Sequence, residues 1–199
     1  MGVRSLIHGV GVNDADYPVV RHENVDNKRK RVWMCPYYSR WATMLKRCYS
    51  QKHHSAQPTY TDCLVCNDWL VFSEFKRWME KQDWQDRALD KDLLIPNNRL
   101  YSPRTCVFVD VKINNFLLDS RATRGKYMIG CFLHKSSGKF RAMCRNPFTD
   151  KHEHLGLFTN ELQAHLAWKT RKHELACMLA ESEYVDDPRV AEALRTRYL

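Results

Sequence analysis

Two carboxylates and a lysine stand next to one another in the segment LDKDLLIPNNRLYSPRTC, residues 89–106. The carboxylates of Asp90 and Asp92 could hold a divalent cation, because Mg²⁺ and Mn²⁺ prefer oxygen ligands. With Lys91, the same side chains could instead form a charged turn in which opposite charges pair with one another. The residue types by themselves leave both interpretations open.

Four cysteines could also bind a metal. Cys63 and Cys66, in CLVC, have the spacing that lets two thiolates reach one Zn²⁺. Cys48 and Cys106 could complete a structural zinc site with four cysteines. The alternative is four small buried thiols in a reducing compartment. We expect three further cysteines to lie in the core: Cys131, Cys144 and Cys177.

The charge of the chain is +9 and is unevenly distributed. Residues 120–152 contain eight Lys and Arg residues but one carboxylate, Asp150. This concentration favours a polyanionic partner, most simply nucleic acid, over an ordinary solvated basic face. The N-terminus has no apolar stretch of signal-peptide length, and no apolar run approaches the roughly 20 residues that cross a bilayer. We therefore expect a cytosolic protein that does not enter a membrane.

Helical periodicity predicts the elements before the charged segment. A helix should begin at Pro36, with Trp41, Met44, Leu45 and Cys48 on its buried face. A second helix should span about 69–81, and the polar residues 50–62 between them should form a loop. Around the charged segment, turn residues and the run CVFVDV predict the order strand, turn, strand, helix.

Residues after 126 predict a small α+β unit. Residues 120–126 are polar and basic and indicate a linker. Three strands should follow, in MIGCFLHK, KFRAMCR and HEHLGLF, and SSG indicates a hairpin between the first two. A long helix should run over 161–183, with an apolar set at Leu162, Leu166, Leu175, Met178 and Leu179, and a last short helix should start after Asp187. Three strands and one long helix form a minimal two-layer unit.

Strand alternation assigns the two faces of this sheet. Phe140, Ala142 and Cys144 share one face, which suits the long helix. Arg141 and Arg145 share the other, where arginine could read guanine in a major groove while flanking lysines hold phosphate. The alternative is an ordinary solvated outer face of the sheet.

The segment GCFLHKSSGKFRAMCRNPFTDKHEHLGLFTNELQAHLAW resembles the APETALA/ethylene-response-factor DNA-binding domain over about 50 residues. The family pattern fits Gly130, Gly138, Lys139, Phe140, Leu155, Gly156, Phe158 and Ala164. The resemblance implies that the exposed sheet face lies in the major groove of double-stranded DNA. Carried over by position, and with the flanking lysines included, it implies nine DNA-binding residues: Phe132, His134, Lys135, Lys139, Arg141, Met143, Arg145, His152 and His154. Several arginines and tryptophans of the family are replaced by Phe, His and Met, so it supports groove binding more than any base sequence.

The first half resembles HNH-type homing endonucleases of phages, through YYSRWATMLKRCY, YTDCLVCNDWLVFSEFKRWM, LDKDLL and YSPRTCVFV followed by IN. The resemblance implies a divergent ββα-metal fold with one catalytic Mg²⁺ or Mn²⁺. By position, Asp90 and Asn114 would bind this metal, with Asp92 as a substitute ligand. Lys91 stands at the position of the general base, and Thr105 at that of its orienting asparagine. Lysine is normally protonated near pH 7, so it suits phosphate stabilisation better than proton abstraction. A different base, His53 or His54, has no support from spacing.

Together these features predict an α+β protein in four parts: an HNH-like domain at 1–119, a linker at 120–126, the DNA-binding domain at 127–184 and a short C-terminal helix at 185–199. The first hypothesis is a phage HNH-type endonuclease that binds and cuts or nicks double-stranded DNA in the host cytoplasm. The second is a DNA-binding regulator that has lost catalysis. The third is a protein that binds a host protein through its aromatic first half.

Overall fold

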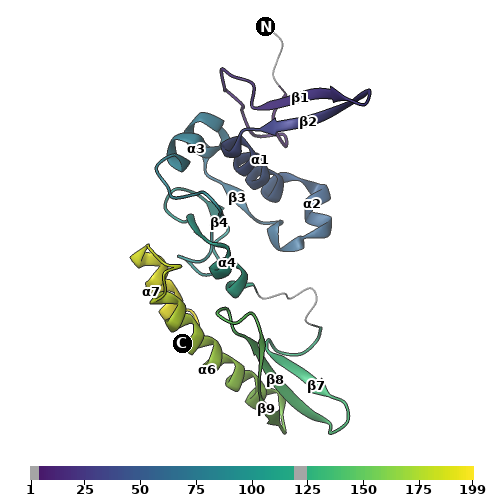
Figure 1. Cartoon of the computed structure of the whole chain (residues 1–199), viewed down its shortest axis with the longest axis vertical. Coiled ribbons are helices and arrows are strands. Elements are labelled where there is room, and N and C mark those ends of the chain that lie inside the picture. Colours follow the sequence, from purple (N-terminus) through teal and green to yellow (C-terminus); the bar gives the residue numbers. More distant parts are fainter. Residues whose placement is uncertain (1–4, 119–124) are drawn as a thin grey trace. The chain divides into compact units, whose positions relative to one another are not determined.

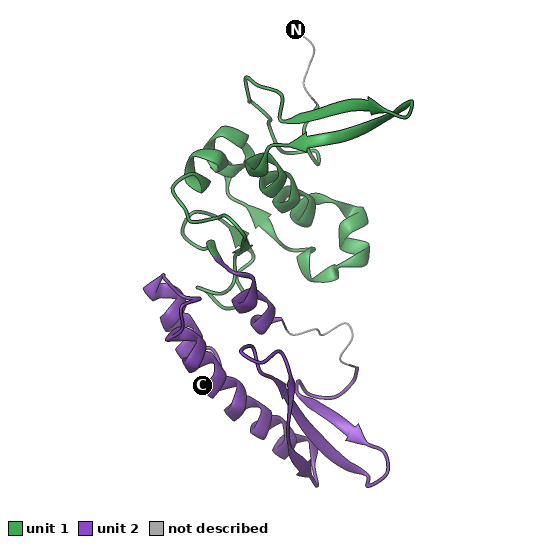
Figure 2. Ribbon diagram, in the orientation of Figure 1, with its two compact units in different colours: residues 1–108 green, residues 109–199 purple. Residues whose placement is uncertain are grey.

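The computed structural model describes residues 5–118 and 125–199, which form a mixed α+β protein. The chain divides into two compact units, unit 1 at Met1–Phe108 and unit 2 at Val109–Leu199 (Figure 2). Unit 2 therefore includes the helix 111–117, which the sequence-based division at residue 119 assigns to the first domain. Most of the predicted linker 120–126 lies outside the described residues. None of the described helices has the length and apolar composition needed to cross a bilayer.

Unit 1 begins with a β-hairpin followed by helices (Figure 1). The predicted helix at Pro36 is confirmed, and Trp41, Met44, Leu45 and Cys48 are buried as its periodicity indicates. The elements of this part are β1 Val20–Val25, β2 Lys28–Met34, α1 Pro36–Tyr49, α2 Gln51–Ala56 and the 3-10 turn η1 Pro58–Tyr60.

The prediction of a loop at 50–62 is wrong, because this stretch contains α2 and η1. Ser50 caps α2, and its side chain accepts a hydrogen bond from the backbone N–H of His53 at 3.3 Å. A serine cap can start a short helix in a polar sequence without apolar periodicity.

The second half of unit 1 contains short elements joined by long turns. The second predicted helix is shorter than expected, because Trp69 lies in a 3-10 turn before it, but Phe72, Phe75 and Met79 are buried. The strands β3 and β5 pair in parallel, and β4 pairs with β6. The elements are β3 Leu64–Val65, η2 Asn67–Leu70, α3 Phe72–Met79, β4 Arg87–Asp90, β5 Leu100–Tyr101 and β6 Val107–Asp110.

Large aromatic side chains fill the core of unit 1. Trp41, Trp69 and Phe75 are at most 1% exposed. The indole N–H of Trp41 donates to the carbonyl of Trp69 at 2.7 Å, so its polar atom is satisfied within the core. This core fixes α1 against α3 and supports the turns that carry the charged segment.

Unit 2 contains the predicted three-stranded sheet and a long helix (Figure 1). The sheet is antiparallel in the order β7-β8-β9, with Cys131 opposite Ala142 and Ala142 opposite Gly156. The elements are α4 Val111–Leu117, β7 Cys131–His134, β8 Lys139–Arg145, β9 His152–Phe158, α6 Glu161–Ala180 and α7 Pro188–Thr196.

The last two helices, α6 and α7, each begin after a residue whose side chain caps the first turn. The side chain of Asn160 accepts a hydrogen bond from the backbone N–H of Gln163, at 2.9 Å, and so caps α6. Asp187 caps α7 by accepting from the backbone N–H of Arg189 at 2.8 Å, and Pro188 occupies the first turn. Both predicted helix starts are therefore confirmed.

The predicted buried face of α6 is wrong in part. Leu175 and Leu179 are buried, but Leu162, Leu166 and Met178 are 57%, 50% and 49% exposed. Small residues let the helix approach the sheet closely, so the buried stripe includes three alanines and a lysine besides large apolar side chains. That stripe consists of Ala164, Trp168, Lys172, Leu175, Ala176, Leu179 and Ala180.

Candidate nucleic-acid interface

The exposed face of the β7-β8-β9 sheet is built by cross-strand pairs. Arg141 lies between Phe132 and Leu157 on the neighbouring strands. Cross-strand partners share a face of the sheet, so these three side chains form one row. Two further rows come from β8 and β9, in which Met143 pairs with His154 and Arg145 with His152. We call this surface, with His134 and Lys139 at its hairpin end, the basic sheet face.

Packing on the opposite side decides which face remains exposed. Cys131, Ala142 and Ala164 form a small buried cluster between sheet and helix. Gly130 has φ +81, and a Cβ at this position would lie 2.0 Å from the Trp168 ring. The backbone before β7 therefore rests directly on the indole of α6, and this contact requires glycine.

The carboxylate of β9 faces the helix. Glu153 pairs with Arg171 of α6 at 2.7 Å and accepts from the Asn146 amide at 2.8 Å. These hydrogen bonds, from Arg171 first, lower the pKa of Glu153 to about 2. Glu153 is the one carboxylate in the three strands, so the basic sheet face carries none. In the turn after β8, Asp150 lies 3.4 Å from Arg145 and is largely exposed.

Two side chains on this face, those of Arg141 and Phe132, have polar or apolar surface without a partner in the described part of the chain. The Nε of Arg141 is buried and has no hydrogen-bond partner among the described residues. Buried donors are normally satisfied, and because this N–H is shielded from solvent, a ligand or water could reach it only after the Arg141 side chain moves. Phe132, beside it, is 41% exposed and offers an apolar surface.

A groove of about 730 Å³ lies beside the basic sheet face within unit 2. Phe132, Arg145 and His152 line it from the sheet, and Lys112 and Phe116 line it from α4. The carboxylate of Asp150, which pairs with Arg145, also lines the groove, so the groove carries both signs of charge.

Lys172 of α6 also lines this groove and is 8% exposed. Its amine donates to the carbonyl of Phe116 at 2.6 Å and lies 3.4 Å from the centre of the Phe116 ring. Burial lowers the pKa of Lys172 to about 8. No sequence pattern predicts the burial of Lys172, because a lysine in a helix is ordinarily solvated.

The charged segment of unit 1 forms a hydrogen-bonded turn. Oδ1 of Asp90 accepts from the backbone N–H groups of Asp92 and Leu93, at 2.8 and 2.7 Å. Burial, and then the nearby Asp92 carboxylate, raises the pKa of Asp90. Asp90 therefore stabilises the turn that follows β4.

Lys91 and Thr105, at the expected base and orienting positions, are both buried. The amine of Lys91 donates to Asp92 at 2.8 Å and to the carbonyl of Asn98 at 2.9 Å. The hydroxyl of Thr105 donates to the carbonyl of Leu100 at 2.6 Å. The polar groups of both side chains are thus used in holding the loop between β4 and β5 in place.

The residues expected to bind a catalytic metal are divided between the two units. Asp90 ends β4 in unit 1, and Asn114 is half-buried in α4 of unit 2. Among residues 5–118 and 125–199, no group of three or more His, Cys, Asp or Glu side chains could hold a metal ion. No reaction step through Mg²⁺ or Mn²⁺ follows from these side chains, and the catalytic metal stays a prediction.

Three of the four cysteines considered for zinc lie in the core of unit 1. Cys48, Cys63 and Cys106 are 1–3% exposed, while Cys66 is half-buried. Burial, followed by the neighbouring thiol of Cys63, raises the pKa of Cys48 to about 12, and burial raises that of Cys106 to about 12. Neutral buried thiols fit these surroundings, and the zinc site stays a prediction.

The two histidines of α2 show no catalytic arrangement. The Nε2 of His54 lies 2.8 Å from the carbonyl of Arg47. The ring of His53 lies 5.5 Å from that of Tyr60, and burial lowers the pKa of His53. Neither contact joins these rings to the charged segment.

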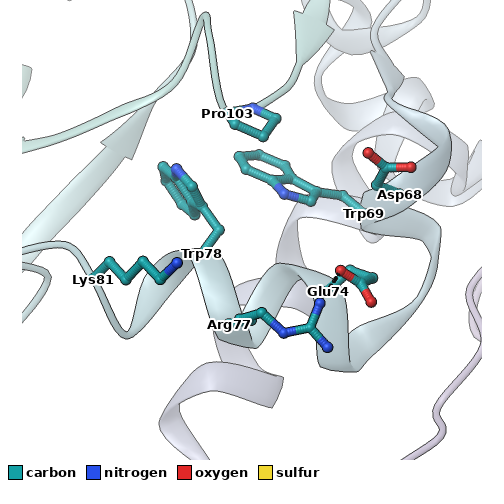
Figure 3. A pocket seen from close by; sticks show the side chains of 7 residues that line it. All are labelled: Asp68, Trp69, Glu74, Arg77, Trp78, Lys81 and Pro103. Atoms are coloured by element: carbon teal, nitrogen blue, oxygen red, sulfur yellow. Dashed lines mark hydrogen bonds and ion pairs between the residues drawn. The ribbon is translucent and has the colours of Figure 1, made fainter.

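A shallow pocket of about 210 Å³ lies over α3 (Figure 3). Figure 3 shows the ring of Pro103 next to the indole of Trp69, with Trp78 beside them. The indoles of Trp69 and Trp78 have their centres 4.5 Å apart, and Arg77 pairs with Glu74. Acids and bases both line the pocket, so its charge selects no ligand class.

Comparisons of the chain with protein-family models, with curated proteins and with solved structures found no match. The two family resemblances therefore rest on the sequence motifs quoted above.

Proposed function

We propose that this protein binds double-stranded DNA through the basic sheet face of unit 2. The observation that carries the proposal is the segregation of charge across the sheet. Arg141, Arg145 and two histidines lie on the open face, whereas Glu153 is turned to the helix and paired with Arg171. An open, cationic face without carboxylates in its strands fits a polyanion.

The geometry of the sheet also favours a groove over a flat phosphate surface. The major groove of B-DNA, about 12 Å wide, admits β-strands as well as helices. Arg141 stands in the middle strand between Phe132 and Leu157, where its guanidinium can bond a guanine edge or a phosphate. A three-stranded antiparallel sheet with one long helix on its back is also what the APETALA/ethylene-response-factor resemblance predicts, which supports the same proposal.

We favour binding without cleavage over an HNH-type nuclease. Lys91 and Thr105 have their polar groups engaged by the loop around them, and Oδ1 of Asp90 accepts two backbone hydrogen bonds there. Recruiting these residues for catalysis would break contacts that hold the loop. The test is incubation with supercoiled DNA and Mg²⁺ or Mn²⁺. Nicking that Asp90→Ala abolishes, while binding is retained, would restore the nuclease hypothesis.

Duplex binding is tested with Arg141→Gln/Arg145→Gln in the full chain. Each lost phosphate contact lowers the slope of log K against log salt by about 0.9, so the slope should fall by up to about 2. The control is Lys169→Gln/Arg195→Gln, which removes the same charge from α6 and α7 in the same unit. Fluorescence anisotropy with a labelled duplex gives both slopes. Equal losses in the two variants would show that net charge, and not this face, governs binding.

A further inference from the structure

The hairpin of β1 and β2 in unit 1 is exposed along nearly its whole length. Every residue from Arg21 to Val32 is exposed. Asp26 and Asn27 form its turn with φ 53 and 57, the conformation of a type I′ turn, which matches the twist of a two-stranded ribbon. At its base, Trp33 and Met34 pack against the core. The ribbon is thus anchored at one end and solvated on both faces.

The pairing register separates two different faces. On one, His22 is opposite Arg31, and Asn24 is opposite Arg29. We call this set the arginine face. On the other face Glu23 is opposite Lys30, and Val25 is opposite Lys28. Arg21, next to His22 in β1, also lies on this second face, opposite Trp33, because the register shift adds its extra residue to β2. Both faces carry cations, but the carboxylate of the two strands lies only on the second.

The arginines of the first face are available for a ligand. Nη1 of Arg31 lies 3.7 Å from the sulfur of Met34, which is uncharged, whereas Arg21 of the second face stacks over the Trp33 ring at 4.5 Å. Within residues 5–118 and 125–199, Arg29 and Arg31 form no ion pair with a carboxylate. On the second face Lys30, by contrast, pairs with Asp26 at 3.5 Å.

We propose that the arginine face of the β1–β2 hairpin inserts into the major groove of double-stranded DNA, as a contact separate from the basic sheet face. A two-stranded ribbon fits the major groove, where Arg binds guanine and Asn binds adenine through paired hydrogen bonds. Arg29, Arg31 and Asn24 supply these groups on one side of the ribbon. The major groove of A-form RNA is too narrow and deep for side chains to read, so duplex DNA is the partner.

The chain offers a matched test, because neighbouring residues of β2 point to opposite faces. Arg29→Gln/Arg31→Gln removes two charges from the arginine face, and Lys28→Gln/Lys30→Gln removes two from the other. Binding of a DNA duplex to the full chain is measured by fluorescence anisotropy. The arginine double substitution should lower the slope of log K against log salt by about 2, and the affinity about tenfold near 0.15 M salt. The lysine pair should cause less than half of that change in slope.

Equal losses from both pairs would overturn the proposal, because they would reflect net charge alone. An arginine pair that binds like the wild type would overturn it too, as would an RNA duplex that competes as well as DNA. Far-UV circular dichroism and the ¹⁹F resonance of Trp33 in fluorotryptophan-labelled protein check that the ribbon still forms.

The same comparison in an Arg141→Gln/Arg145→Gln background separates the two surfaces. If the basic sheet face does not bind DNA, this background leaves the affinity unchanged. The difference between the two hairpin variants can still be measured in that case. Failure of the proposed function and failure of the hairpin proposal are therefore distinguishable.

Discussion

Replacing Lys172 by methionine should change how the stability of unit 2 depends on pH. The Lys172 amine is 8% exposed, and burial lowers its pKa from 10.5 to about 8. Below pH 8 the amine carries a proton in both the folded and the unfolded chain, and the folded state bears the cost of burying that charge. Between pH 8 and 10.5 only the unfolded chain keeps the proton. Raising the pH through this window therefore favours the folded wild type.

The size of the effect follows from the two pKa values. The difference of about 2.5 corresponds to about 3 kcal/mol over the whole window, at 1.36 kcal/mol for each pKa unit. From pH 7 to pH 10 the wild type should gain about 2.5 kcal/mol in unfolding free energy relative to Lys172→Met. The comparison of the two proteins cancels the titration of other groups that do not contact Lys172.

The assay is urea unfolding at pH 7 and pH 10 with fluorotryptophan-labelled protein. Trp168 is the one tryptophan of residues 109–199, so its ¹⁹F resonance reports on unit 2 alone. Lys169→Met is the control, since it removes a half-exposed lysine from the same helix. If the unfolding free energies of both variants depend on pH in the same way, the effect reflects net charge and not the burial of Lys172. A stability difference that does not change with pH, or that changes in the opposite direction, would refute the reasoning about burial.

Two further substitutions test structural contacts. Gly130→Ala should destabilise unit 2 by about 2 kcal/mol, because the added Cβ would collide with Trp168. Gly138→Ala, also at positive φ but with nothing within 4 Å of the added Cβ, should cost less. Thermal unfolding measures both losses of stability, and equal losses would contradict the packing argument. Asp90→Ala should destabilise unit 1 by about 1–2 kcal/mol, because two backbone N–H groups lose their acceptor. Asp90→Asn keeps a carbonyl oxygen as acceptor and should cost little stability. Urea unfolding compares the two variants, and equal losses would show that the turn does not depend on that oxygen.

The sheet of unit 2 could be predicted from sequence because its signals are local. Strand alternation and the SSG turn identify three strands and both of their faces, and β9 has the predicted bounds, His152–Phe158. The side-chain caps at Asn160 and Asp187 likewise mark the helix starts. These features depend on residues close in the chain, which a sequence pattern can show.

The buried face of α6 could not be predicted in the same way. Lys172 is buried while Leu166 is exposed, contrary to their polarity. The cause is tertiary, because Ala142 and Ala164 let the sheet and helix approach closely, and Phe116 supplies a carbonyl and a ring for the lysine. Partners this distant in sequence leave no periodic signal in α6.

The structures of the N-terminal hairpin and of the charged segment could not be predicted from the sequence either. The residues from Arg21 to Val32 are all exposed, so they have no apolar alternation, and only the turn residues Asp26 and Asn27 indicate a hairpin. In the charged segment the residue types allowed either a metal site or a self-paired turn. The hydrogen bonds of Asp90 and Lys91 show the pairing, which sequence alone could not decide.

Photo-crosslinking tests most directly whether DNA lies on the basic sheet face. A benzoylphenylalanine at Phe132, which is 41% exposed on that face, should crosslink to duplex DNA on irradiation. The same group at Leu166, which is 50% exposed on α6, should not. Crosslinking at Phe132 alone is the predicted result. Crosslinking at Leu166 and not at Phe132 would contradict the account.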